Sequence, residues 1–266
     1  MEIVDTHTHV ISPDTARYPL DPVGGRQSGW SQEHPVDIDG LVRALDEAGI
    51  AKAVVVQAST VYGHDNRYVA EAVRAHPDRF VGVYSIDAMA ADAVERIEHW
   101  QGQGLSGFRL FTTGTTMPGQ ADWLGHERSH PAWAHAEAHG IPVCLQMTIQ
   151  GLPALRSLLE RFPGVRVLLD HCARPDLADG RPYRAARDLF DLAAHPACTS
   201  NSRTGPSRPP PRAGPPRRSS SRTSWPPMAP AASRGAPTSP PPREGPPVSW
   251  PRPGTRRWPC RQPTRR

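Results

Sequence analysis

Runs of apolar residues alternate with amphipathic stretches along the first two thirds of the chain. Short continuous apolar runs, such as AKAVVVQ at 51–57, are typical of strands that are buried on both faces of a parallel sheet. Between them, apolar residues recur at helical spacing, as in the helix predicted between Asp37 and Gly49. We expect strands at 3–11, 51–57, 80–86, 107–111, 141–147 and 165–171, and further helices at 66–75, 90–101, 131–138, 152–162 and 181–194.

Six strand–helix units in fewer than 200 residues predict a parallel α/β fold. The two candidate architectures are a TIM-type (β/α)8 barrel and an open doubly wound sheet. The first strand is not followed by the glycine-rich phosphate loop of a nucleotide-binding sheet, so we favour the barrel. Because about six units are visible, the prediction is a barrel truncated after the sixth unit.

The last 69 residues have a different composition. Residues 198–266 contain fourteen Arg, no Lys, one acid (Glu244) and nineteen of the 32 prolines, and they lack Leu, Ile, Phe and Tyr. The net charge of +5 therefore conceals +13 in this segment and −8 in residues 1–197. A segment with so little to bury cannot offset the entropy lost on ordering. We expect an incomplete barrel over 1–197 and a disordered Arg/Pro-rich tail over 198–266.

Two explanations of this tail stay open. Arg, Pro, Ala, Gly and Ser dominate this segment. These are the residues that GC-rich DNA encodes when it is read out of frame. After a one-base shift, the codons of residues 198–202 can encode Leu-Tyr-Leu-Lys-Leu, a plausible strand, and those of residues 235–240 can encode Trp-Gly-Ser-[Asp/Asn]-Phe-Pro. The alternative is a genuine basic arm that binds nucleic acid or an acidic partner, but it contains no recognition module. We favour a frameshift, in which case strands seven and eight are lost and the chain as written is inactive.

The motif Asp5-Thr6-His7-Thr8-His9 lies in the first predicted strand. With an alternation of period two, Asp5, His7 and His9 project from one face of that strand. Two neighbouring imidazoles can point at one ion, and neutral imidazole is the commonest protein metal ligand. The competing interpretation is an edge strand with surface histidines. The alternating strands and helices that follow favour a metal site.

Reactive side chains in a barrel lie at the carboxyl ends of the strands. Arg109 in the fourth strand suits either a substrate carboxylate or a structural ion pair. His171, which ends the sixth predicted strand, is either a functional or a structural histidine, and Arg174 follows it. Further candidates are Gln57 and Gln146, and Tyr62 and His64 are weaker candidates for a substrate contact. We expect the remaining histidines on the surface: His64, His126, His130, His135, His139 and His195.

Three motifs resemble those of the amidohydrolase-related metal-dependent hydrolases: Asp-Thr-His-Thr-His at 5–9, Gly-Phe-Arg-Leu at 107–110 and Leu-Asp-His-Cys-Ala-Arg-Pro at 169–175. The most similar branch holds 2-pyrone-4,6-dicarboxylate lactonase and related muconolactone and sugar lactonases. The resemblance covers residues 2–197. It implies a distorted (β/α)8 barrel, with His7, His9 and His171 as catalytic residues and metal ligands. It also implies an aspartate from strand eight as the general base, which this chain lacks.

Two departures from the family pattern refine this expectation. The fourth strand has no lysine to be carbamylated, which argues against a two-metal site. Gln146 stands on the fifth strand where a histidine would strengthen zinc binding. We therefore expect hydrolysis of a lactone ring in a small carboxylated substrate, bound by Arg109, Arg174, Gln146 and Tyr62. The alternative is a zinc-dependent decarboxylase or another hydrolase of the family, and the cofactor is a divalent metal, Zn²⁺ first, unless none is required.

The four cysteines (Cys144, Cys172, Cys198 and Cys260) show no paired spacing, and no signal peptide or long apolar span is visible. We therefore expect a cytoplasmic location without a membrane segment. The sequence does not determine the oligomeric state.

Overall fold

The computed structural model describes residues 3–114, 116, 119–193, 195 and 198–200. Most of the predicted tail, residues 201–266, lies outside the described residues, so its disorder stays a prediction. Within the described part, no helix combines the length and the apolar character needed to cross a membrane.

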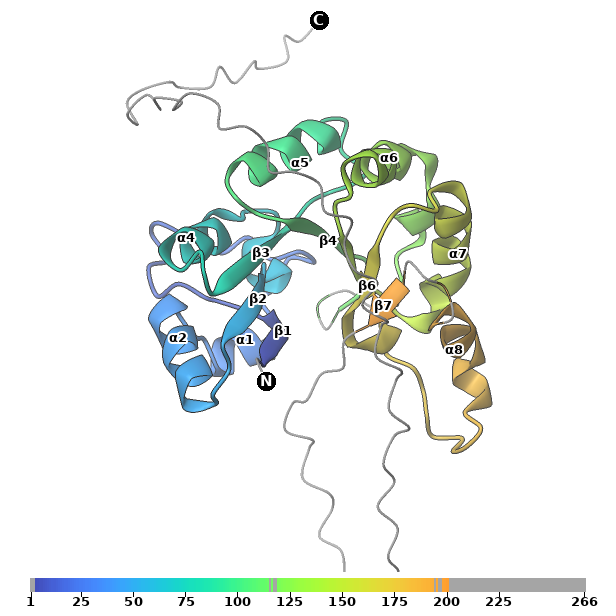
Figure 1. Ribbon diagram of the computed structural model, residues 1–266, viewed down its shortest axis with the longest axis horizontal. Coiled ribbons are helices and arrows are strands. Elements are labelled where there is room, and N and C mark those ends of the chain that lie inside the picture. Colours follow the sequence, from blue (N-terminus) through green and yellow to red (C-terminus); the bar gives the residue numbers. More distant parts are fainter. Residues whose placement is uncertain (1–2, 115, 117–118, 194, 196–197, 201–266) are drawn as a thin grey trace, which may run out of the picture. The chain divides into compact units, whose positions relative to one another are not determined.

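The described strands form one parallel sheet in the order β1-β2-β3-β4-β5-β6-β7. The sheet curls into part of a barrel, and the helices lie along its outer face (Figure 1). This arrangement confirms a truncated TIM-type barrel as the fold. The strands are β1 (Val4–Thr8), β2 (Lys52–Val56), β3 (Phe80–Ser85), β4 (Gly107–Phe111), β5 (Val143–Gln146), β6 (Val167–Leu169) and β7 (Cys198–Ser200).

The helices predicted from the sequence are present with ends shifted by up to three residues, except that the helix predicted from residue 181 begins at Arg187. Asp37 caps the helix before β2, because its carboxylate accepts a hydrogen bond from the Gly40 amide at 2.7 Å. Gly140 ends the helix before β5 in the left-handed conformation. The helices are α1 (Gly29–Glu33), α2 (Ile38–Glu47), α3 (Ser59–Tyr62), α4 (Arg67–Ala75), α5 (Ala93–Gly102), α6 (His130–His139), α7 (Leu152–Arg161) and α8 (Arg187–Ala193).

The sheet extends one strand beyond the boundary that we placed after residue 197. Cys198–Ser200 form β7, in which Ser200 pairs with Leu169 of β6. The prediction that order stops before residue 198 is therefore wrong by this strand. Cysteine, threonine and serine pair through the backbone, which needs no large apolar side chain. Of the described strands, β1 and β7 are the edges of the sheet, and β6 is an inner strand.

The two faces of the sheet have different contents. Large side chains such as Tyr84, Phe108 and Leu145 belong to the main core. A separate small cluster of Val56, Val83 and Cys144 lies on the opposite face of the same strands. Because side chains alternate along a strand, Ser85 and Gln146 lie on this same face, two residues after Val83 and Cys144 and at the carboxyl ends of β3 and β5. The curled sheet therefore directs polar groups inward at the carboxyl ends of its strands.

Candidate active site

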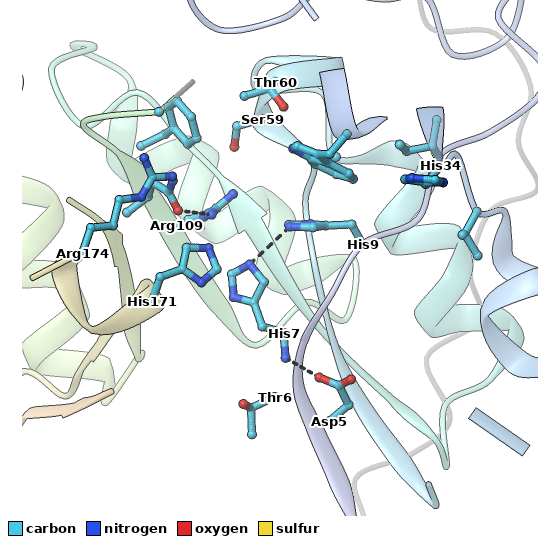
Figure 2. A pocket seen from close by; sticks show the side chains of 17 residues that line it. Asp5, Thr6, His7, His9, His34, Ser59, Thr60, Arg109, His171 and Arg174 are labelled. Atoms are coloured by element: carbon cyan, nitrogen blue, oxygen red, sulfur yellow. Dashed lines mark hydrogen bonds between the residues drawn. The ribbon is translucent and has the colours of Figure 1, made fainter. Parts of the chain in front are cut away.

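A cavity of about 310 Å³ opens at the carboxyl ends of the strands. Its walls come from β1, from the segments that contain α1 and α3, from β4 and β5, and from the turn after β6 (Figure 2). The polar and aromatic side chains among its lining are Asp5, Thr6, His7, His9, Trp30, His34, Ser59, Thr60, Arg109, Phe111, Gln146, His171 and Arg174.

His7 and His9 face each other across one end of the cavity, with their Nε2 atoms 3.2 Å apart (Figure 2). The Nδ1 atom of His9 lies 2.6 Å from the Val56 carbonyl oxygen, and that of His7 lies 3.2 Å from a carboxylate oxygen of Asp170. Both partners are acceptors, so each Nδ1 is the donor. When both rings are neutral, the lone pair of each Nε2 therefore points at the other ring.

Two lone pairs at this distance repel each other unless a proton or a cation lies between them. Two ring nitrogens on one tetrahedral zinc, each about 2.05 Å from the metal, are about 3.3 Å apart, so the observed separation fits a shared ion. Burial, followed by the nearby His7 and Arg109, lowers the pKa of His9 well below 6.5, which favours the neutral form that binds metals.

These two histidines are not a complete ligand set. The ring of His171 lies 5.0 Å from that of His7, measured between centroids. Over the described residues, however, no group of three or more His, Cys, Asp or Glu side chains converges on one point as a metal site would require. The residues thus supply two ligands that fit an ion, with His171 beside them.

Asp170 connects His7 of β1 to Arg109 of β4. Its buried carboxylate lies 3.2 Å from His7 Nδ1 and accepts a hydrogen bond from Arg109 Nε at 2.9 Å. Burial alone would raise the pKa of Asp170, but Arg109 and His7 outweigh it and hold this pKa well below its usual range. We did not single out Asp170 from the sequence. The available signal was an acid at the end of a buried strand, directly before a candidate histidine.

Arg109 is almost completely buried, with 3% of its surface exposed. Besides the bond to Asp170, its guanidinium donates to the Gln146 side-chain oxygen at 2.7 Å and to the Gln57 carbonyl oxygen at 3.4 Å. It lines the cavity as well. Of the two roles that the sequence allowed for Arg109, the structural ion pair is therefore present. The negative charge of Asp170 neutralises the positive charge that a substrate carboxylate would meet.

The backbone after β6 is left-handed over four consecutive residues. His171, Cys172, Ala173 and Arg174 have φ between 50° and 55°, and none of them is glycine. Such residues cost roughly 1–2 kcal/mol each. The turn ends β6 at Leu169, earlier than the prediction of 171, and its first and last residues line the cavity. Strained backbone of this kind clusters at functional sites.

The wall beside β1 includes residues that sequence analysis missed. The ring of Trp30 stacks on that of His9, with centroids 5.1 Å apart and an interplanar angle of 27°. His34 lines the cavity from the same segment. This segment contains the short helix α1, and Ser28 anchors it: the Ser28 hydroxyl lies 2.7 Å from that of Thr60 on α3.

Tyr62 and Gln57 have other surroundings. The hydroxyl of the buried Tyr62 accepts a hydrogen bond from the Ser12 amide at 2.7 Å. The Gln57 amide donates to the carbonyl oxygens of Gly63 and Asp65 at 3.0 and 3.1 Å. Neither belongs to the described residues that line the cavity, whereas Gln146 and Arg174 do. Tyr62 and Gln57 hold loops in place around the site.

Comparison with known proteins agrees with the motifs. L-fucono-1,5-lactonase of Burkholderia ambifaria is 28% identical over 162 residues, which are 61% of this chain and 54% of that protein. The chain therefore spans about half the length of this curated relative.

Two solved structures share the fold. One is an amidohydrolase of Burkholderia multivorans with bound zinc, with a TM-score of 0.58, 21% identity, and coverage of 75% of this chain and 69% of that one. The other is a probable 2-pyrone-4,6-dicarboxylic acid hydrolase of Acinetobacter baumannii with citric acid bound, with a TM-score of 0.54, 24% identity, and coverage of 72% and 66%. At these identities the likeness concerns the fold alone.

A family model described as Amidohydrolase matches residues 4–215. Because this match takes in far more than half of the sequence, the chain belongs to the amidohydrolase family.

Proposed function

We propose that this cavity binds a lactone and that water opens the lactone ring. The observation that carries the proposal is the gathering of His7, His9 and His171 around one cavity with Arg109 and Arg174. Guanidinium N–H groups stabilise the negative charge that develops on a carbonyl oxygen during attack by water, and a cation held by His7 and His9 would do the same. The similarity to L-fucono-1,5-lactonase supports the same class of reaction.

Arg174 is the residue that we assign to a carboxylate of the substrate. It lines the cavity from the end of the left-handed turn, and its guanidinium suits bidentate binding of a carboxylate. The charge of Arg109 is balanced by Asp170, so Arg109 contributes N–H donors rather than net charge. This favours a lactone with one carboxylate over one with two.

A hydroxylated sugar lactone is the second candidate substrate. The cavity wall contains the side chains of Thr6, Ser59 and Thr60, whose hydroxyls suit a polyhydroxylated ring. The ring of Trp30, stacked on His9, adds an apolar surface of the kind on which a sugar ring packs.

His7 and His9 are the residues that would hold a divalent ion, with His171 as the neighbouring candidate. The family is often metal-dependent, and a solved relative contains zinc. When bound, such an ion polarises a carbonyl and lowers the pKa of a water molecule. Asp170 and the Val56 carbonyl orient the two imidazoles in either case.

Activity assays on three kinds of lactone test the proposal. The purified chain is incubated with monocarboxylated, dicarboxylated and sugar lactones, with and without a chelator, and ring opening is followed by acid release. Hydrolysis of a lactone supports the proposal. Decarboxylation or amide cleavage without lactone hydrolysis would instead favour the zinc decarboxylase or another hydrolase of the family.

Arg174→Ala assigns the substrate contact. We expect KM for a carboxylated lactone to rise by about one to two orders of magnitude, because a charge-assisted contact is lost. For an uncharged sugar lactone, KM should change little. Equal effects on the two substrates would contradict the assignment.

We also retain the proposal that the chain as written is inactive, because no strand-eight acid was found in its sequence. Binding then replaces turnover as the test. Titration calorimetry with the hydroxy acid product should detect binding that Arg174→Ala weakens.

A further inference from the structure

A chain of hydrogen-bonded side chains leads from the cavity to His64. Ser59 lines the cavity, and Figure 2 shows its hydroxyl directed toward the cluster of site side chains. That hydroxyl lies 3.3 Å from the hydroxyl of Ser85, the last residue of β3. The Ser85 hydroxyl in turn lies 3.0 Å from Nδ1 of His64. Both serines are 1% exposed, whereas His64 is half-buried, so the chain runs from the cavity wall through the interior toward the surface.

The surrounding backbone holds these three groups in register. Asn66, which is fully buried, accepts a hydrogen bond from the Ser85 amide at 2.6 Å. Its own amide group donates to the Ser85 and His64 carbonyl oxygens, each at 3.0 Å. These contacts fasten the segment between α3 and α4 to the end of β3. Rotation of hydroxyl groups is then the only movement needed for proton transfer along the chain.

The charge environment of His64 suits a group that accepts protons near neutral pH. Burial is the main cause that lowers its pKa below 6.5. Asp87, which follows β3, and Asp21, in the segment after β1, oppose this effect, and Arg96 of α5 adds to it. A histidine with a lowered pKa is neutral at pH 7 and gives up a proton readily after accepting one.

We propose that Ser59, Ser85 and His64 form a proton relay between the cavity and the solvent, an inference that rests on the proposed lactone hydrolysis. Ser59 is the member that lines the cavity. His64 and Ser85 act through it and are positioning residues for its proton. Among the described residues of this chain, the relay supplies a route for the proton that the strand-eight acid would otherwise take.

The oxygen of water bonds to the carbonyl carbon, and the bond between that carbon and the ring oxygen breaks. One proton of the water passes to Ser59 Oγ, while the Ser59 hydroxyl proton moves to Ser85 and the Ser85 proton moves to Nδ1 of His64. His64 then releases a proton to solvent. The second proton of the water goes to the departing ring oxygen, which leaves a carboxylate and an alcohol.

The relay requires a rotation of the Ser59 hydroxyl and one particular tautomer of His64. At rest the Ser59 hydroxyl can also donate to the Gln57 side-chain oxygen at 2.9 Å, so it must rotate toward Ser85 during transfer. Nδ1 of His64 must carry a lone pair in order to receive the proton from Ser85, so the proton of the neutral ring must be on Nε2.

Nitrogen-15 NMR of the histidine side chains tests this demand without any need for turnover. Comparison with His64→Gln assigns the signals. We expect the neutral His64 ring to carry its proton on Nε2 at pH 7.5, and Ser85→Ala to change the Nδ1 shift. A ring protonated on Nδ1 in the neutral form would overturn the relay.

Kinetics of a lactone that the chain hydrolyses provide the second test. We expect His64→Gln to lower kcat roughly tenfold with little change in KM, which is less than the factor of about 100 or more expected from a base in direct contact. Free imidazole in the buffer should restore the rate of His64→Gln but not that of Ser85→Ala, whose chain is interrupted inside the protein. Ser85→Thr keeps the hydroxyl and should retain the rate.

Two matched variants control for burial. His135→Gln removes another half-buried histidine, and Ser129→Ala removes another buried hydroxyl, each on or beside α6. Both should leave kcat unchanged. Wild-type kcat in His64→Gln, or a loss that imidazole does not restore, would overturn the relay. If the wild-type chain hydrolyses no lactone, as expected of a chain that is inactive as written, the NMR result decides the relay, and binding of the hydroxy acid product decides the proposed function.

Discussion

Replacement of Asp170 by asparagine should lower the free energy of unfolding by about 3–5 kcal/mol. The side chains of Asp170 and Arg109 are 0% and 4% exposed, and the ion pair between them is 2.9 Å long. Asparagine has nearly the same shape, but it carries no charge and turns one acceptor into a donor. Either Arg109 Nε or His7 Nδ1 would then face a donor, and the guanidinium would stay charged in the interior. The expected loss is a large part of the 5–15 kcal/mol typical of a folded domain.

Urea unfolding followed by circular dichroism measures this loss as a lower midpoint with an unchanged slope. Asp92→Asn is the matched control, because its pair with Arg96 is about half exposed and should contribute less than about 1 kcal/mol. Removal of both buried charges in Asp170→Leu/Arg109→Met should recover much of the stability, since an apolar pair of similar size is often as stable as a buried ion pair. Equal losses for Asp170→Asn and Asp92→Asn would refute the reasoning.

Three further predictions concern separate features. Gly63→Ala should lower the Tm more than Gly25→Ala, because both residues have positive φ but only at Gly63 would a Cβ lie 2.4 Å from a backbone oxygen; equal losses would contradict this. Burial lowers the pKa of His135, so its contribution to stability is present above pH 6.5 and is lost as the pH falls below that value; unfolding at pH 7.5 and 5.5 should show a smaller acid loss in His135→Gln than in wild type. Equilibrium dialysis should detect one bound Zn²⁺ that His9→Ala weakens by about 100-fold or more, and retention of the ion by this variant would exclude the proposed histidine pair.

The periodicity of the sequence was sufficient to predict most of the sheet. Buried parallel strands are continuous apolar runs, and the strand at 107–111 has the predicted bounds. The proximity of His7 and His9 followed from the alternation of side chains along one strand, and the structure brings their ring nitrogens to 3.2 Å. These features depend on local geometry, which a sequence pattern encodes directly.

The rest of the site depends on contacts between distant segments. The short helix that carries Trp30 has no apolar periodicity of its own, and it is held by the contact of Ser28 with Thr60, 32 residues away. The left-handed backbone after β6 occurs in residues that rarely adopt it, so no propensity predicts it. Asp170 acquires its role only when β1, β4 and β6 come together. Tertiary contacts override local preference in each case.

The position of β1 at an edge of the described sheet has a consequence for the dynamics of the site. Among the described strands, β1 pairs with β2 alone, and the exposed fraction of its Val4 side chain is 48%. An edge strand with little buried apolar surface detaches at a lower free energy than inner strands such as β4. Its amide hydrogens should therefore exchange with deuterium before those of the inner strands, through fraying that spares the main core. Each such excursion separates the His7 imidazole from Asp170 and dismantles the site in a protein that is otherwise still folded.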